Sequence, residues 1–495
     1  MEVIGLPQPF RLVPPPVALP LLPEGGNGPS ILAPGVPPST FPDMKPHAIV
    51  PTCVLTVMLA VTLRAQEQRY FDWTALPFPA EEFAARRETF ATRLATMGDG
   101  VMLIPSIDGV SGGETFRQQD TFMYFTGLEL PRSILAIGSD GDVMLFAPPR
   151  DPRFENRSRT NDFPGRPLAD DPVLVARSGI GAIRSTDEFE ALVSFLVEED
   201  VPIYLDMGSP GDVPTPRIRP HLNWDAHDNF YAYLRERHPQ ATLVNAFPLV
   251  AAQRMVKSRA EIERMRATAR ITSEAIMIAG ARVHPDVDER TLEAVFEGAC
   301  KEGGAQRLSF SSIIKSGPNS LWPWRVLASH YDRRNRAMEA GDLVIFDVGC
   351  ELDGYVSDVG RTFPVSGSFN DEQRGILEMV IGVTDAIIAA IRPGTTFRAL
   401  REVGQRTIPR EHRRYMMVGN FYGHHLGLST GDPSLLDAPL EPGMIFTVEP
   451  WYYNHDIAIA VFIEEEVLVT SDGAEVLTAA LPRTPDELEA VVRRR

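Results

Sequence analysis

Strands and helices alternate in the hydrophobic pattern between residues 83 and 253. A helical stretch from Ala84 to Met97 is followed by an apolar strand from Val101 to Pro105. The same spacing rules predict strands at 133–137 and 142–147, a helix at 186–199 and a strand at 203–206. This alternation predicts a smaller mixed α/β domain at residues 83–253.

A second pattern begins at residue 257 and runs to residue 495. Ser258 followed by Glu261 is the signature of a helix capping box, and the apolar residues after it share one face of a long helix. Further helices are expected from Asp288 or Glu289 to about Cys300, from Asn370, and after the cap Thr484. With the apolar strands between these helices, the pattern predicts an α+β domain with antiparallel strands.

The segment from Val344 to Phe363 predicts a hairpin that carries two aspartates. An apolar run ends at Asp347, a turn follows around Asp353 and Gly354, and a short second strand carries Asp358. If the turn is centred near Leu352 and Asp353, the two aspartates lie opposite each other, about 4.5–5.5 Å apart at Cβ. Carboxylates that close repel unless a cation lies between them, and a pair of divalent metals is one solution. Two solvated turn aspartates are the alternative.

Three more segments contain potential metal ligands. His424 lies in a Gly-flanked segment, Glu449 ends an apolar strand, and Glu464 follows another. A buried carboxylate must be paired, protonated or bound to metal. Two aspartates, two glutamates and one histidine can hold two divalent ions; this oxygen-rich set favours Mn²⁺, with Zn²⁺, Co²⁺ or Fe²⁺ as alternatives. Taken alone, His424 is more typical of a hydrogen-bonded core histidine, and Glu465 and Glu466 are typical of solvated strand charges.

In this order, the five residues resemble those of the metallopeptidase family of aminopeptidase P, prolidase and methionine aminopeptidase, and aminopeptidase P in particular. The resemblance runs from about Phe83 to the end of the chain. It includes residues 116–127, 256–262, 347–364 and 447–450. It implies a pita-bread catalytic domain at 257–495.

The resemblance also implies roles for individual residues. Asp347, Asp358, His424, Glu449 and Glu464 match the metal ligands. Glu449 would relay a proton to the leaving nitrogen, His330 would stabilise the oxyanion on the substrate side, and Tyr453 matches a tyrosine near the site. The implied activity is removal of the amino-terminal residue of a peptide, ahead of proline. A prolidase-like dipeptidase, another amide hydrolase and a non-catalytic peptide-binding relative are the alternatives.

Four positions depart from the family pattern. Asn420 and Gly431 stand where the family usually has histidines, Phe462 stands where arginine is frequent, and Gly360 stands where threonine is common. His425 and His455 are candidates to replace the missing histidines, and we include His425 among the predicted substrate-binding residues. We therefore expect an intact set of metal ligands with altered surroundings.

Composition excludes one class of partner. The chain of 495 residues has 48 Lys and Arg against 66 Asp and Glu, a formal net charge of -18, and no basic stripe. A nucleic-acid partner is therefore not expected, because binding to phosphates needs clustered positive charge. We expect a peptide substrate and a homo-oligomer.

The amino terminus predicts export to the periplasm or the exterior. Residues 1–43 contain 12 of the 43 prolines and predict a disordered leader. Residues 44–65 read as a signal peptide, with Met44 as the true start and cleavage after Ala65. Its apolar run is shorter than the ~20 residues that span a bilayer, so stable membrane insertion is not expected. Cys300 and Cys350 then remain in the mature chain, and whether they form a single disulfide stays open.

Overall fold

The computed structural model describes residues 76–107, 116–148, 172–208, 226–321, 335–416, 423–435 and 437–494. The predicted leader at 1–43 and the predicted signal peptide at 44–65 lie outside these ranges. No helix in the described ranges has both the length and the apolar character that crossing a bilayer requires.

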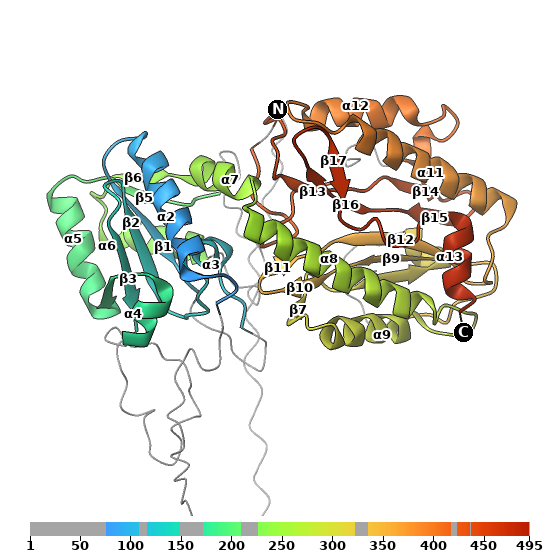
Figure 1. Cartoon of the computed structure of the whole chain (residues 1–495), viewed down its shortest axis with the longest axis horizontal. Helices are drawn as coiled ribbons and strands as arrows, with labels where there is room; N and C mark the ends of the chain where they lie inside the picture. Colours follow the sequence, from blue (N-terminus) through green and yellow to red (C-terminus); the bar gives the residue numbers. More distant parts are fainter. Residues whose placement is uncertain are drawn as a thin grey trace, which may run out of the picture. The chain divides into compact units, whose positions relative to one another are not determined.

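A mixed six-stranded sheet in the order β4-β3-β2-β1-β5-β6 forms the centre of the amino-terminal domain (Figure 1). Its strands are β1 (Val101–Pro105), β2 (Ile134–Gly138), β3 (Val143–Ala147), β4 (Ala182–Ser185), β5 (Ile203–Leu205) and β6 (Leu243–Asn245). Its helices are α2 (Ala80–Ala95), α3 (Asp120–Thr126), α4 (Pro172–Ser178), α5 (Phe189–Glu198), α6 (Ala226–Arg237) and α7 (Phe247–Met255). The mixed α/β character predicted from the sequence is confirmed.

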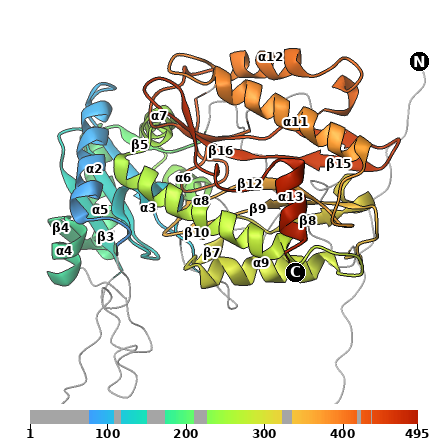
Figure 2. The same cartoon turned by 45° about the vertical axis from the view of Figure 1, so that its right-hand side comes forward.

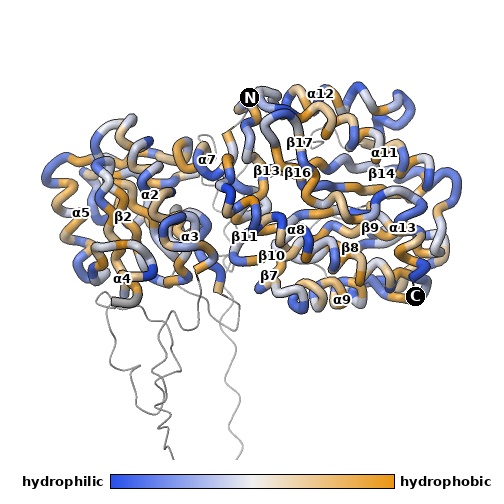
Figure 3. Tube along the Cα trace, viewed as in Figure 1, coloured by the Kyte–Doolittle hydropathy of each residue, from blue (hydrophilic) through white to orange (hydrophobic). Residues whose placement is uncertain are grey.

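Antiparallel strands form the centre of the carboxyl-terminal domain. β9 (Leu343–Val348) lies between β8 (Ile313–Ser316) and β12 (Val359–Pro364) in one sheet. The other sheets contain β13 (Ile445–Val448), β16 (Glu465–Val469) and β17 (Ala474–Val476); β14 (Trp451–Asn454) and β15 (Ile459–Phe462); and β7 (Arg307–Leu308), β10 (Cys350–Leu352) and β11 (Tyr355–Val356). Every residue of β9 is buried, and hydrophobic residues concentrate along these strands (Figure 3).

Helices cover these strands in pairs. The helices α8 (Arg259–Gly280) and α9 (Glu289–Glu302) lie side by side, as do α11 (Asp371–Ala390) and α12 (Phe397–Thr407), in both Figure 1 and Figure 2. The last helix, α13 (Pro485–Val492), packs on β12. The predicted capping box at Ser258 is present, and the helix expected from Asn370 also begins with a capping box. Asp288 caps α9 and Thr484 caps α13.

The hairpin turn is formed by Asp353 and Gly354, one residue later than a turn centred near Leu352 and Asp353. Asp353 and Gly354 both have positive φ, at 54° and 84°, which is the conformation of a two-residue turn that matches the twist of the strands. Leu352 therefore pairs with Tyr355, and Asp347 pairs with Gly360. Asp358 is thus a diagonal neighbour of Asp347 and not its direct partner, at a separation that carboxylates bridging metal ions can still span.

A disulfide joins Cys300 of α9 to Cys350 of β10. Both cysteines are fully buried in the main hydrophobic cluster of the carboxyl-terminal domain. The bridge that the sequence left open therefore ties α9 to the hairpin between β9 and β12.

Charged side chains of the amino-terminal domain contact the same hairpin within the structural unit formed by residues 65–495. Arg117 donates to Glu351 at 2.9 Å, and Arg86 donates to the hydroxyl of Tyr355 at 3.2 Å. The Tyr355 hydroxyl in turn donates to Glu261 at 3.0 Å. Arg117 and Arg86 therefore hold the outer end of the hairpin.

Candidate metal centre

The five predicted ligands converge from four strand ends and one loop. Asp347 lies at the end of β9, Asp358 precedes β12, Glu449 follows β13, and Glu464 lies between β15 and β16. The fifth residue, His424, is fixed by main-chain pairing with Thr447, two residues before Glu449.

Distances between side chains place these groups in one cluster. Ligand atoms of Asp358, His424 and Glu464 all lie within 4.8 Å of one another. The Nε2 atom of His424 lies 3.4 Å from Oδ2 of Asp358 and 3.7 Å from Oε1 of Glu449. Asp347 interacts with both Asp358 and Glu449. The set is therefore brought together in full.

Several buried atoms of the cluster have no hydrogen-bond partner among the described residues. The four carboxylates are between 1% and 5% exposed. The unpartnered atoms are Oδ2 of Asp347, Oδ1 of Asp358, Oε2 of Glu464 and Nδ1 of His424. Buried polar atoms almost always have partners, and buried anions need a counter-charge. Divalent cations satisfy both requirements, so the residues fit a metal centre.

The electrostatics agree with this interpretation. Burial, and then the neighbouring carboxylates, raise the pKa of Asp347 and Glu464 well above ordinary values. Burial also raises the pKa of Glu449 to about 7, although the charge of His424 opposes the shift. For His424, burial lowers the pKa, but the hydrogen bond and charge of Asp358 outweigh it and raise the pKa to about 9. Without cations, the cluster therefore retains protons.

The residues next to Glu464 correct one prediction. Glu465 and Glu466 are buried and not solvated, because β16 is buried along its whole length. Glu465 forms a 2.9 Å ion pair with Arg361. Glu466 accepts a hydrogen bond from the main-chain N–H of Asp358 at 3.1 Å and another from Ser357. Both therefore support the strands that carry the ligands.

Sequence reasoning missed two residues that hold Glu449. The Thr447 hydroxyl donates to Oε1 at 3.2 Å, and the Trp451 indole donates to Oε2 at 3.1 Å. Thr447 and Trp451 each lie two positions from Glu449, so in an extended chain their side chains point to the same side as that of Glu449. This spacing of two residues was the sequence signal that could have identified them.

The other predicted site residues have different outcomes. Tyr453 is half-buried on β14 and stacks on Trp451, with ring centroids 5.4 Å apart. His330 and Asn420 lie outside the described residues. Gly431 has open space where a Cβ would be, and its φ is not positive.

His425 does not lie among the carboxylates. Its ring packs 5.0 Å from that of Phe397 and 6.0 Å from that of Phe446, in the hydrophobic core. Because His424 and His425 are successive residues of an extended segment, their side chains point to opposite sides. Burial lowers the pKa of His425 to about 3. This placement does not support its predicted substrate-binding role, and it favours a structural one.

Two of the departures from the family pattern form a matched pair. A Cβ at Gly360 would overlap the ring of Phe462. Phe462 in turn stacks on Trp451, with centroids 3.4 Å apart and planes at 16°. The glycine therefore leaves the space that the aromatic ring fills, and the two departures are one change in packing.

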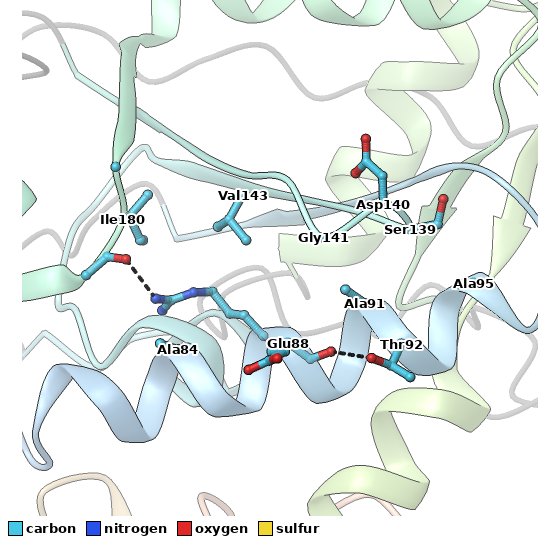
Figure 4. A pocket seen from close by; sticks show the side chains of 13 residues that line it. Ala84, Glu88, Ala91, Thr92, Ala95, Ser139, Asp140, Gly141, Val143 and Ile180 are labelled. Carbon is cyan, nitrogen blue, oxygen red and sulfur yellow. Dashed lines mark hydrogen bonds between the residues drawn. The ribbon is translucent and has the colours of Figure 1, made fainter.

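A hollow of about 700 Å³ in the amino-terminal domain contains none of the predicted ligands (Figure 4). It lies against α2 and the turn between β2 and β3. Arg87, the cation at its edge, donates to the carbonyl of Phe125 at 2.8 Å and to that of Gly179 at 3.4 Å. Its guanidinium thus holds main chain in place, and the hollow is separate from the metal centre.

Two family models match the chain. Residues 263–471 match the metallopeptidase family M24, and residues 83–202 match the aminopeptidase P amino-terminal domain. The chain is 27% identical to Xaa-Pro aminopeptidase of Escherichia coli K12 over 452 residues, covering 83% of this chain and 97% of that protein. It is 28% identical to Xaa-Pro aminopeptidase 3 of Mus musculus, with 77% of each chain covered.

Solved structures give the same result. Aminopeptidase P of E. coli with the inhibitor Pro-Leu superposes with a TM-score of 0.68 at 27% identity, covering 84% of this chain and 98% of that one. Aminopeptidase PepP of Pseudomonas aeruginosa gives a TM-score of 0.70 at 26% identity, covering 84% and 99%. The fold is therefore the pita-bread catalytic domain preceded by a smaller amino-terminal domain. The two family models, the relatives and the solved structures agree that the chain belongs to the aminopeptidase P family and is a metal-dependent aminopeptidase.

Proposed function

We propose that this protein is an exported, dinuclear aminopeptidase that releases the amino-terminal residue of peptides in which proline comes second. The observation that carries the proposal is the cluster of five ligands with unpartnered buried oxygens. The name of the E. coli relative, and the Pro-Leu inhibitor in the E. coli structure, support proline as the second residue.

Asp347, Asp358, His424, Glu449 and Glu464 would hold two divalent ions. Bound ions of this kind supply a water of lowered pKa and a Lewis acid for the scissile carbonyl. Four of the five ligands are carboxylates, which favours Mn²⁺ over softer ions. A zinc-substituted form of the E. coli enzyme has been solved, so Zn²⁺ is the first alternative to test.

The protein's own side chains then have separate tasks. Glu449 accepts a proton and passes it to the leaving nitrogen, and its two oxygens are already oriented by Thr447 and Trp451. His330 would donate to the oxyanion that forms at the carbonyl. Tyr453, which is half-buried and stacks on Trp451, would contact the substrate.

The buried disulfide supports export. Disulfides persist in oxidising compartments and are rare in reducing ones. Together with the signal-like segment before Ala65, the Cys300–Cys350 bridge favours the periplasm or the exterior. Sequencing the amino terminus of the mature protein should find Gln66, and a mature protein that retains the Pro-rich leader would reject export by this signal. We also propose a homo-oligomer, which light scattering of the purified protein tests.

Cleavage of a peptide library tests the proposed activity. Protein stripped of metal and reloaded with Mn²⁺ should release the first residue from Xaa-Pro peptides faster than from matched Xaa-Ala peptides. Asp347→Asn, treated identically, should show neither activity. Metal-dependent cleavage confined to dipeptides would instead assign the protein to the prolidase-like alternative.

A further inference from the structure

Three of the four carboxylates have a buried hydrophobic residue two positions away, and the fourth, Asp358, has a glycine there. Ile345 precedes Asp347 by two residues, Gly360 follows Asp358 by two, Trp451 follows Glu449 by two, and Phe462 precedes Glu464 by two. Because extended chains repeat every two residues, ligand and partner lie on the same side of each strand. Ile345, Trp451 and Phe462 form one buried hydrophobic cluster, which we call the aromatic layer.

Trp451 is fixed within this layer on several sides. It is 1% exposed and pairs directly with Phe462 across β14 and β15. The two rings stack, and Tyr453 stacks on Trp451 with planes at 16°. Gly360 provides the space that Phe462 needs. The indole therefore has little freedom to rotate, and its N–H direction is set by packing.

That N–H points at a metal ligand. Nε1 of Trp451 lies 3.1 Å from Oε2 of Glu449, and Oε1 of the same carboxylate accepts from Thr447. An indole can donate but cannot accept a hydrogen bond, so it always presents a donor to this oxygen. The Thr447 hydroxyl can rotate and also accepts the N–H of His424. The more rigid of the two constraints on Glu449 is therefore Trp451.

We infer that Trp451 is a positioning residue whose indole N–H fixes the carboxylate of Glu449 in the orientation required for metal binding. This inference rests on the proposed metal centre. Trp451 and Phe462 are both buried and offer almost no surface to a substrate, so Trp451 acts through its hydrogen bond to Glu449 and not by contact with the peptide.

The test separates the N–H from the packing. Trp451→Phe keeps a ring in the stack and removes the donor, whereas Phe462→Leu removes a ring from the same layer and keeps the donor. Partners of metal ligands are typically worth about 10–100-fold in metal affinity. We expect Trp451→Phe to weaken Mn²⁺ binding to the metal-free protein by that factor in calorimetry, and to lower kcat more than it raises KM. Phe462→Leu should lower the melting temperature but change Mn²⁺ affinity by less than about threefold, because the donor remains.

A second variant covers the case in which Trp451→Phe does not fold. Replacement of Trp451 alone by β-(3-benzothienyl)alanine keeps the shape of the side chain and exchanges the N–H for sulfur. Weaker Mn²⁺ binding in this variant supports the inference. Wild-type affinity in either N–H-deficient variant, or equal weakening in Phe462→Leu, would overturn it. The Mn²⁺ affinity of the wild type tests the proposed metal centre, and the change in affinity of the variants tests the role of Trp451. Failure of one proposal can therefore be distinguished from failure of the other.

Discussion

At the scale of single residues, two neighbouring classes of buried carboxylate behave in opposite ways. Asp347 is buried among like charges with an unpartnered oxygen, whereas Glu465 is equally buried but paired with Arg361. Without metal, Asp347 therefore lowers the stability of the folded protein, whereas the ion pair of Glu465 raises it. Substitution of Asp347 should stabilise the metal-free protein, and substitution of Glu465 should destabilise it.

Asp347→Asn should raise the melting temperature of the metal-free protein, because asparagine is neutral in this buried cluster without having to take up a proton on folding. It should also reduce peptidase activity to the level of the metal-free wild type. Differential scanning calorimetry with and without Mn²⁺ measures the first effect, and a peptide assay measures the second. A variant that keeps the wild-type response to Mn²⁺ would remove Asp347 from the ligand set.

Glu465→Gln serves as the matched control. Breaking a buried ion pair from one side typically costs about 3–5 kcal/mol, because the remaining charge is left without a partner. The loss should be similar with and without Mn²⁺, since Glu465 bonds Arg361 and Thr478 and not the metal cluster. Chemical denaturation measures it.

The missing family histidine at Gly431 is a further test at this scale. Because a Cβ there meets open space and φ is not positive, Gly431→His should fold. Combined with Asn420→His, it should raise kcat/KM on Xaa-Pro peptides, since one donor to a developing charge is worth up to about 10²–10³ in rate. Unchanged kinetics in a folded, metal-binding double variant would indicate a substrate that does not need these donors.

At the scale of elements, the hairpin from β9 to β12 explains what the sequence could and could not predict. The aspartates, the apolar strands and the Asp-Gly turn are local signals, and all three were found. The pairing of the two strands depends on which residues occupy the turn. A turn centred on Leu352 and Asp353 would pair Asp347 with Asp358, whereas the observed turn, one residue later, pairs Asp347 with Gly360. Trp451 and Phe462 were missed as a pair because their contact crosses two strands, which no local pattern reports.

The same hairpin is tied down by the disulfide between Cys300 and Cys350. The cysteines are 50 residues apart in sequence, and a bridge over such a loop typically contributes about 2–4 kcal/mol. Cys300→Ala together with Cys350→Ala should lose about that much in urea unfolding. Reductant should weaken the wild type and leave the double variant unaffected. Equal sensitivity of both proteins to reductant would mean that the bridge contributes nothing.

At the scale of the whole molecule, the fold class was predictable because five candidate ligands, two Asp, one His and two Glu, follow one another in the order that the family shows. The solvent exposure of Glu465 and Glu466 was wrongly predicted, since the sequence does not reveal that both faces of β16 are covered. Likewise, the sequence does not reveal which of His424 and His425 points towards the carboxylates. That follows only from the main-chain pairing of His424 with Thr447.

The raised pKa values predict how stability depends on pH. With folded-state pKa values of Asp347, Glu449 and Glu464 above those of the unfolded chain, the metal-free native state binds more protons from about pH 4 upward. The pKa of His424, raised to about 9, acts in the same direction above pH 6.5. This site therefore destabilises the metal-free protein as pH rises from about 4 to 9.

Metal binding should reverse that trend, because metals bind the deprotonated ligands. The difference in melting temperature between Mn²⁺-loaded and metal-free protein should therefore grow between pH 5 and pH 8. Taking the difference cancels titrating groups elsewhere, such as Lys257 and Asp432. A difference that is flat with pH would contradict the shared protonation of the cluster.

The central claim is that Asp347, Asp358, His424, Glu449 and Glu464 together hold two divalent ions. Calorimetric titration of metal-free protein with Mn²⁺, checked by elemental analysis after removal of free metal, tests it most directly. The account predicts two ions per chain in the wild type and fewer than two in Asp347→Asn. Failure of the wild type to bind Mn²⁺, Zn²⁺ or Co²⁺, or two ions retained in the variant, would contradict it.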